Sequence, residues 1–286
     1  MQNLSLKNKC QKIGLVLSII AVPIIIYFYF LKWKTVVIYG DDLSIYTNYI
    51  GLNSFYEKMN FPLSFGKYRP IHGLSMSFLI ETFQKNLEAY YFFNIAMQTL
   101  ITFSFALVVN LFLKSPTYSL FISLTIGLSR FSFFNITQLL NGGALEGLAM
   151  TLFLLTLFFI LRVLVNNDYT SLQKQNGIIL SVIFANLTLY THERYIVVFP
   201  FIILLILFFP SLKTLALKQR LTLIITALLS IVLNIVIKKY VYSIPFFVGT
   251  AGTNISFSFS TTFQFLIEAI LSIVQINTGP AYLVGI

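Results

Sequence analysis

The sequence predicts an all-α protein, a polytopic transmembrane helical bundle. Hydrophobic residues make up 57% of the 286 residues, and charged residues make up only 10%. A soluble domain carries about 25% charged residues, and one soluble core of this length does not bury so much apolar surface. Several apolar segments also approach the length of about 20 residues that crosses a bilayer.

We expect about eight spans in a single transmembrane domain that covers residues 1–286. Lys7, Lys9 and Lys12 precede the first apolar segment, which places the N-terminus in the cytoplasm by the positive-inside rule. The chain ends without a polar tail, which suggests a C-terminally truncated member of a longer family. The expected spans cover about residues 13–31, 90–113, 118–134, 144–165, 176–190, 195–209 and 221–237, and an eighth begins near Thr262.

The fifth and sixth spans are short, and two interpretations fit them. They form either a helical hairpin that turns at His192-Glu193-Arg194, or a single helix that continues through these residues and breaks at Pro200. The single helix would bury several ionisable groups, and a charged one costs at least about 2.5 kcal/mol at the bilayer centre. We therefore prefer the hairpin.

Residues 32–89 form the longest moderately polar stretch and are expected to be the first outer loop. A connection of this length is usually functional. Residues 43–59 and 71–83 look amphipathic, so we expect short helices that lie at the membrane interface. Pro70 suits the first position of the second of these helices.

The net charge of +10 would favour nucleic-acid binding in a soluble protein. Here the basic residues stand singly between apolar segments, so membrane lipids are the expected partners and nucleic acid is not. The single cysteine excludes an intrachain disulfide. The abundance of Phe, Ile, Asn and Lys indicates a bacterial gene, and we expect a multi-pass protein of the bacterial plasma membrane.

Polar outliers gather on one side of this predicted topology. With the first helix running outward, four groups fall on the outer face, whereas the other face carries mainly scattered lysines and arginines. The four groups are Asp41 with Asp42, residues 67–72, residues 138–146 and residues 192–194. This asymmetry is the main functional signal in the sequence.

Asp41 and Asp42 are adjacent carboxylates that follow a membrane span and a glycine, Gly40. Such a pair can hold a divalent cation, Mg²⁺ or Mn²⁺, or one acid can act as a general base while the other orients a substrate. The structural alternative is that an Asp begins a helix at Leu43. The two interpretations are compatible if the acids divide these roles.

Lys67, Arg69 and His72 place three potential cations within six residues. A phosphate is bound by such a set of donors, and Arg is the best of them. The alternative is that these side chains anchor lipid headgroups.

Glu146 and the run His192-Glu193-Arg194 complete the candidate substrate-binding residues. Glu146 lies about one turn into a predicted helix, where an acid also stabilises the helix electrostatically. The run of three has an equally plain alternative as an interfacial Glu–Arg pair. No Walker loop, GxGxxG, CxxC, HExxH or GxSxG motif is present in the sequence.

The arrangement resembles the GT-C glycosyltransferases, multi-spanning enzymes such as protein O-mannosyltransferases and aminoarabinose transferases that use polyprenyl-phosphate sugars. Tyr39-Gly40-Asp41-Asp42 matches the acidic pair in the first outer loop of that family. Arg69-Pro70-Ile71 is similar to its basic-Pro-apolar step, and His192-Glu193-Arg194-Tyr195 is similar to its later Lys-Glu pair with His in place of Lys. The likeness covers most of residues 10–210.

The resemblance implies a transferase of the cell envelope that moves a sugar from a polyprenyl-phosphate carrier to a glycan, lipid or protein acceptor. It implies that Asp41 or Asp42 deprotonates the acceptor or helps to hold a metal. Arg69 and Arg194, with His192 or Lys67, would neutralise the leaving phosphate. The alternatives are a transporter or flippase for a lipid-linked or anionic substrate, and a non-catalytic membrane subunit.

Overall fold

The computed structural model describes residues 2–34, 37–166, 168–208 and 216–244, together with Ser260, Phe263, Gln264 and Ile267. These residues form helices and connections and contain no strand, which confirms the all-α class. Four helices are long and apolar enough to cross a membrane: residues 12–33, 87–113, 142–165 and 217–241. The eighth predicted span lies almost entirely outside the described residues.

The chain forms two compact units. Unit 1 comprises residues 1–38, 86–143 and 256–286, and unit 2 comprises residues 39–85 and 144–255. Every candidate site residue of the sequence analysis belongs to unit 2.

Unit 1 packs α1 (Gln2–Phe30) and the short turn η1 (Leu31–Trp33) against α5 (Leu87–Leu113), α6 (Pro116–Gly127) and α7 (Arg130–Thr137). The rings of Trp33 and Phe133 meet edge to face with centroids 5.8 Å apart. A Cβ at Gly127 would lie 2.7 Å from the Thr102 hydroxyl, so this glycine lets α6 approach α5 closely.

The third predicted span is two helices, α6 and α7, rather than one continuous helix. Buried side chains of α5 hydrogen-bond to polar groups in α7 and at its C-terminal end. Asn94 donates to the carbonyls of Ile136 and Gln138 at 3.3 and 2.8 Å. Gln98 donates to the Ser132 hydroxyl at 2.7 Å. These bonds satisfy groups that would otherwise be unpaired in an apolar interior.

Unit 2 begins with α2 (Asp41–Ile50), α3 (Phe55–Met59), the 3₁₀ turn η2 (Phe61–Phe65) and α4 (Pro70–Phe83). The capping box of Ser54 and Glu57 starts α3. A Cβ at Gly73 would lie 1.9 Å from the Met59 carbonyl, so only glycine allows α4 to pass the end of α3. The interfacial helices predicted in the first outer loop therefore exist as helices, and Pro70 begins α4 as expected.

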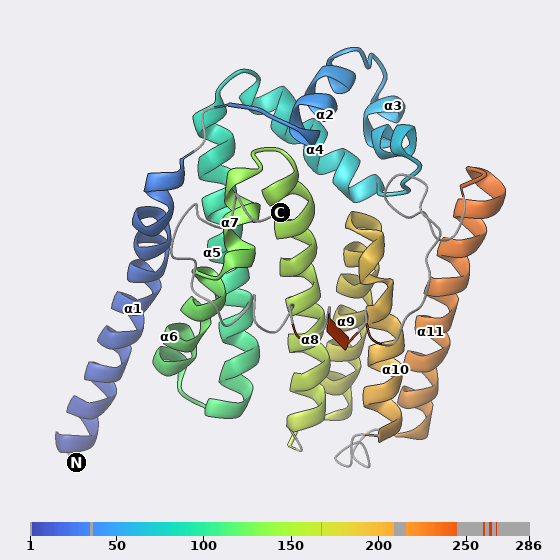
Figure 1. Cartoon of the computed structure of the whole chain (residues 1–286). Helices are drawn as coiled ribbons and strands as arrows, with labels where there is room; N and C mark the ends of the chain where they lie inside the picture. The colour runs from blue at the N-terminus through green and yellow to red at the C-terminus, as the bar shows by residue number, and fades with distance from the viewer. Residues whose placement is uncertain are drawn as a thin grey trace. The chain divides into compact units, whose positions relative to one another are not determined.

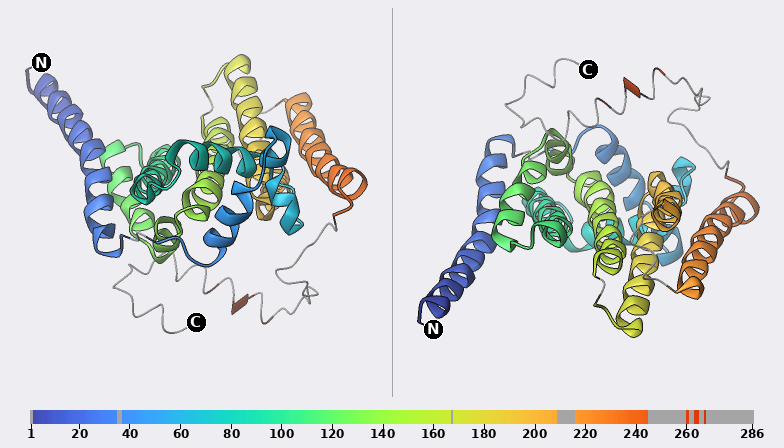
Figure 2. Two further views of the ribbon diagram at one scale, coloured as in Figure 1. Left: turned by 90° about the horizontal axis from the view of Figure 1, so that it is seen from above. Right: turned by 90° about the horizontal axis from the view of Figure 1, so that it is seen from below.

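Four further helices of unit 2 stand side by side, as Figures 1 and 2 show: α8 (Leu148–Val165), α9 (Ser171–Thr191), α10 (Val198–Phe208) and α11 (Leu217–Val236). Their apolar faces meet in one core that includes Ile160, Ala185, Phe199 and Leu223. At one end of this row the chain turns between α8 and α9, and at the other end it meets α4.

The chain breaks between α9 and α10, as the hairpin interpretation requires. α9 ends at Thr191, His192 has extended backbone angles, and the 3₁₀ turn η4 (Glu193–Val197) leads into α10. Ala185 of α9 and Phe199 of α10 lie in the same core, so the two helices pack together after the turn. A single helix through these residues is wrong.

Candidate anion-binding site

Charged side chains from four parts of unit 2 meet where α4 crosses the row of helices. They come from the segment before α4, from the start of the α8 span, from the turn after α9 and from the end of α11. We call these side chains the charged cluster: Lys67, Arg69, Glu146, His192, Glu193, Arg194 and Lys238.

Glu193 is the centre of one half of the charged cluster. Its Oε1 lies 3.2 Å from Lys67 Nζ and 3.2 Å from Arg69 Nη2, and its Oε2 lies 3.0 Å from Lys238 Nζ. The Glu193 side chain is 15% exposed and that of Lys238 is 4% exposed. One carboxylate thus holds three largely buried cations in place.

Glu146 is the centre of the other half. Its Oε1 lies 3.2 Å from His192 Nε2 and 3.7 Å from Arg194 Nη1. The backbone N–H of Arg194 donates to His192 Nδ1 at 3.2 Å. Because Nδ1 accepts this bond, the proton of the neutral ring lies on Nε2 and is donated to Glu146.

Two residues of the charged cluster lie on π-helical turns. Glu146 belongs to η3 (Gly142–Gly147), which precedes α8, and Lys238 belongs to η6 (Ile237–Val241), which follows α11. Such turns add a residue to the helix, change the direction of the side chains that follow, and occur often at functional sites. Glu146 was expected one turn inside an ordinary helix, and the π-turn replaces that expected geometry.

The charged cluster carries an excess of positive charge. Within the ion pairs of the described residues, four cations face the carboxylates of Glu146 and Glu193, which leaves two positive charges when His192 is neutral. Burial lowers the pKa of His192, and Glu146 offsets this only in part. Burial would raise the pKa of Glu193, but Arg69 and Lys238 more than reverse this, so the pKa is lowered and the carboxylate stays ionised.

Arg69 and His72 have buried nitrogen atoms without a hydrogen-bond partner. These atoms are Arg69 Nε and both ring nitrogens of His72. Burial lowers the pKa of His72 to about 3, and the charge of Arg69 contributes in the same direction. A buried polar group without a partner is rare in native proteins. The charged cluster therefore retains hydrogen-bonding capacity that the surrounding protein does not use.

Asp41 and Asp42 form the first turn of α2, after Gly40, whose φ of +59° favours glycine. Asp41 is exposed and Asp42 is buried. α2 contacts α4 through Tyr49, whose hydroxyl donates to Glu81 at 3.4 Å. The aspartates thus belong to the unit that contains the charged cluster.

The described residues contain no preformed metal centre of three or more His, Cys, Asp or Glu side chains. Across residues 2–34, 37–166, 168–208 and 216–244, no three His, Cys, Asp or Glu side chains gather closely enough to hold a metal ion. Mg²⁺ is usually bound by one or two carboxylates together with waters and substrate phosphates, so an adjacent pair such as Asp41 and Asp42 can supply the protein ligands of such an ion.

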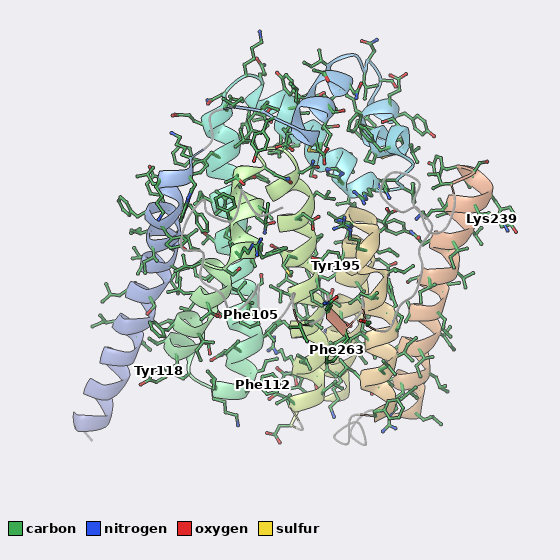
Figure 3. The ribbon with its side chains drawn as sticks, in the orientation of Figure 1. Phe105, Phe112, Tyr118, Tyr195, Lys239 and Phe263 are labelled. Carbon is green, nitrogen blue, oxygen red and sulfur yellow. The ribbon has the colours of Figure 1, made fainter. Side chains whose placement is uncertain are left out.

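The structure brings six of the predicted substrate-binding residues into the charged cluster and places His72 beside it. Sequence reasoning missed Lys238. Adjacent lysines at the end of a span are typical headgroup anchors, and Lys239 fits that role because it is exposed and points away from the helix (Figure 3). No signal in the sequence singled out Lys238, because Arg194 already stands beside Glu193 as a counter-ion.

Fold and site together define an all-helical protein with four candidate membrane spans and a largely buried, net-positive charged cluster. Comparison of the chain with models of protein families, with curated proteins and with solved structures finds no match.

Proposed function

We propose that the protein is a membrane glycosyltransferase of the GT-C type, which moves a sugar from a polyprenyl-phosphate carrier to an acceptor on the outer face of the membrane. The observation that carries the proposal is the convergence of Lys67, Arg69, Arg194 and Lys238 on two carboxylates, those of Glu146 and Glu193, in the part of the chain that the structure describes. A net-positive site at the ends of apolar helices suits a phosphate that carries a long apolar tail.

The cations would act on the leaving group. When the acceptor oxygen bonds to the anomeric carbon of the sugar, the bond between that carbon and the phosphate oxygen breaks, and negative charge develops on the phosphate. Arg69 retains a buried Nε–H without a partner, and the Arg194 side chain is 71% exposed. Both can therefore turn donors toward the phosphate, and stabilisation of developing charge is often what lowers an enzymatic barrier most.

The aspartate pair would act on the acceptor. Asp41 or Asp42 takes the proton of the acceptor hydroxyl as that oxygen attacks the sugar. A positioned general base contributes roughly 10²- to 10⁴-fold to the rate. The exposure of Asp41 leaves it accessible to an acceptor.

Transfer in reconstituted vesicles tests the proposal. The full chain is given polyprenyl phosphates that carry a labelled hexose, N-acetylhexosamine or aminopentose, with a membrane extract as the source of acceptors. We expect transfer of one of these sugars, a loss of at least about 100-fold in the Asp41→Asn/Asp42→Asn variant, and full activity in Asp168→Asn. An active double variant would refute the role of the pair, and no transfer from any donor would refute the proposal.

One observation favours the transporter or flippase alternative. Discontinuous helices near buried polar groups are typical of secondary transporters, and α6 and α7 form such an interruption beside Gln98 and Asn135 of unit 1. The same vesicles decide between the two functions. Movement of the labelled lipid between leaflets without sugar transfer would identify a flippase.

A further inference from the structure

His72 is a buried histidine whose ring makes no hydrogen bond. It lies in the first turn of α4, and Arg69 is the residue that precedes this helix. The residue is 4% exposed, and neither Nδ1 nor Nε2 has a hydrogen-bond partner among the residues that the structure describes. Removing a histidine from water without replacing its hydrogen bonds opposes folding. If His72 only filled space in the interior, an apolar ring at this position would stabilise the fold more.

The surroundings of His72 keep it uncharged. Burial lowers its pKa to about 3, and the charge of Arg69, just before α4, adds to this effect. The nearby carboxylates are engaged elsewhere, because Glu146 pairs with His192 and Glu193 pairs with Arg69. A neutral imidazole presents one donor and one acceptor, and it does not exchange protons readily near neutral pH.

We propose that His72 forms an uncharged subsite beside the charged cluster and binds a hydroxyl-bearing part of the ligand, the sugar ring of the lipid-linked donor. This inference rests on the proposed function and adds a specificity-determining residue to it. His72 is a positioning residue: its ring orients the sugar while the cations of the charged cluster hold the phosphate.

A hydroxyl group can supply the hydrogen-bond partners that the ring nitrogens of His72 lack. A hydroxyl both donates and accepts, so one ring nitrogen can bind one hydroxyl and the second nitrogen a neighbouring one. A phosphate offers only acceptors when ionised and would leave the acceptor nitrogen of His72 without a partner. Sites that hydrogen-bond a substrate hydroxyl discriminate strongly against ligands that lack it. The subsite would therefore distinguish a glycosylated carrier from the bare lipid phosphate.

Binding of two probes to the full chain in detergent tests the inference. The probes are a polyprenyl phosphate and the same lipid with the sugar that the transfer assay identifies, or with a hexose if it identifies none. We expect His72→Phe to weaken binding of the glycosylated probe roughly tenfold and to change binding of the bare phosphate less than twofold. His72→Asn, which keeps a donor and an acceptor, should recover part of the loss. Arg69→Gln should weaken both probes.

Met76→Leu is the matched control, because Met76 lies one turn further along the same face of α4, is fully buried and has no hydrogen-bonding group. It should bind both probes as the wild type does. His72→Phe should also keep or raise the Tm, since it removes a group without a partner; a structural role would lower the Tm instead.

Equal effects of His72→Phe on both probes, or none on either, overturn the inference and leave the proposed function standing. If the wild type binds neither probe, both the inference and the proposed function fail.

Discussion

At the scale of single residues, Glu193 has the largest number of charged partners in the charged cluster. It is the shared counter-ion of Lys67, Arg69 and Lys238, and all four side chains are less than a fifth exposed. A buried ion pair contributes little net stability by itself, but the removal of one partner leaves the other uncompensated. Glu193 therefore sets the spacing of the cations that we propose bind phosphate.

Glu193→Gln should lower the free energy of unfolding by about 3 kcal/mol, since three cations lose their shared counter-ion. Thermal unfolding in detergent measures the effect. Glu88→Gln is the control. Glu88 forms an ion pair with Lys34 at 2.5 Å, but the Glu88 side chain is 61% exposed, and exposed ion pairs contribute little to stability. A stability equal to that of the wild type in Glu193→Gln would contradict the central role of this carboxylate.

The two histidines predict how stability depends on pH. The pKa values of His72 and His192 are both lowered from 6.5, that of His72 to about 3. Below pH 6.5 the unfolded chain binds protons that the folded chain does not, so stability is full above pH 6.5 and falls as the pH drops toward the folded values. Each histidine contributes about 1.4 kcal/mol per pH unit in that window.

His72→Phe/His192→Gln should therefore lose most of the decline in stability between pH 6.5 and pH 5, because the chain has no other histidine. Denaturant unfolding at a series of pH values measures this. An unchanged slope in the double variant would show that the decline comes from other groups.

At the scale of helices and turns, the break between α9 and α10 and two π-turns carry most of the charged cluster. The sequence predicted helices near their observed places, because long apolar segments and the proline at the start of α4 are local signals. It did not predict the interruption between α6 and α7 or the π-turns that carry Glu146 and Lys238. These depend on partners distant in sequence, such as Asn94 for the α7 carbonyls and Glu193 for Lys238.

Gly73→Ala should destabilise unit 2 by about 1–3 kcal/mol, a typical overpacking effect, because the new Cβ would lie 1.9 Å from the Met59 carbonyl. Gly14→Ala is the matched control: its Cβ would meet no atom within 4 Å, and alanine favours a helix interior. Thermal unfolding compares them. If Gly73→Ala is as stable as Gly14→Ala, the close passage of α3 and α4 is wrong.

At the scale of the whole molecule, apolar composition predicted the all-α class, and residue chemistry singled out six of the seven residues that form the charged cluster. Asp41, Asp42 and the residues of the charged cluster all belong to unit 2, although the chain of unit 1 separates residues 39–85 from residues 144–255. That these residues belong to one unit could be expected, because all of them except Lys238 fall in the groups that the sequence predicts on the outer face. The pairing of particular cations with Glu146 or Glu193 could not, because it depends on how the helices pack in three dimensions.

The topology of unit 2 is open to direct labelling. Asn53, before α3, and Asp168, between α8 and α9, are both exposed. Helix α3 and the connection between α8 and α9 lie near opposite ends of α8 (Figure 1). In a Cys10→Ser background, Asn53→Cys and Asp168→Cys should react with an impermeant maleimide from opposite sides of a sealed vesicle. Labelling of both from the same side would contradict a membrane-spanning α8.

The most direct test of the phosphate site is the binding of a polyprenyl phosphate to the purified chain, measured for the wild type, Arg69→Gln and Arg162→Gln. Arg162 lies in the last turn of α8, at the end away from the charged cluster, and controls for the loss of one positive charge. We predict that Arg69→Gln weakens binding at least tenfold, since hydrogen bonds to a charged group contribute about 1.5–3 kcal/mol, while Arg162→Gln binds as the wild type does. Equal affinity in all three proteins would contradict the assignment of the charged cluster as the phosphate site.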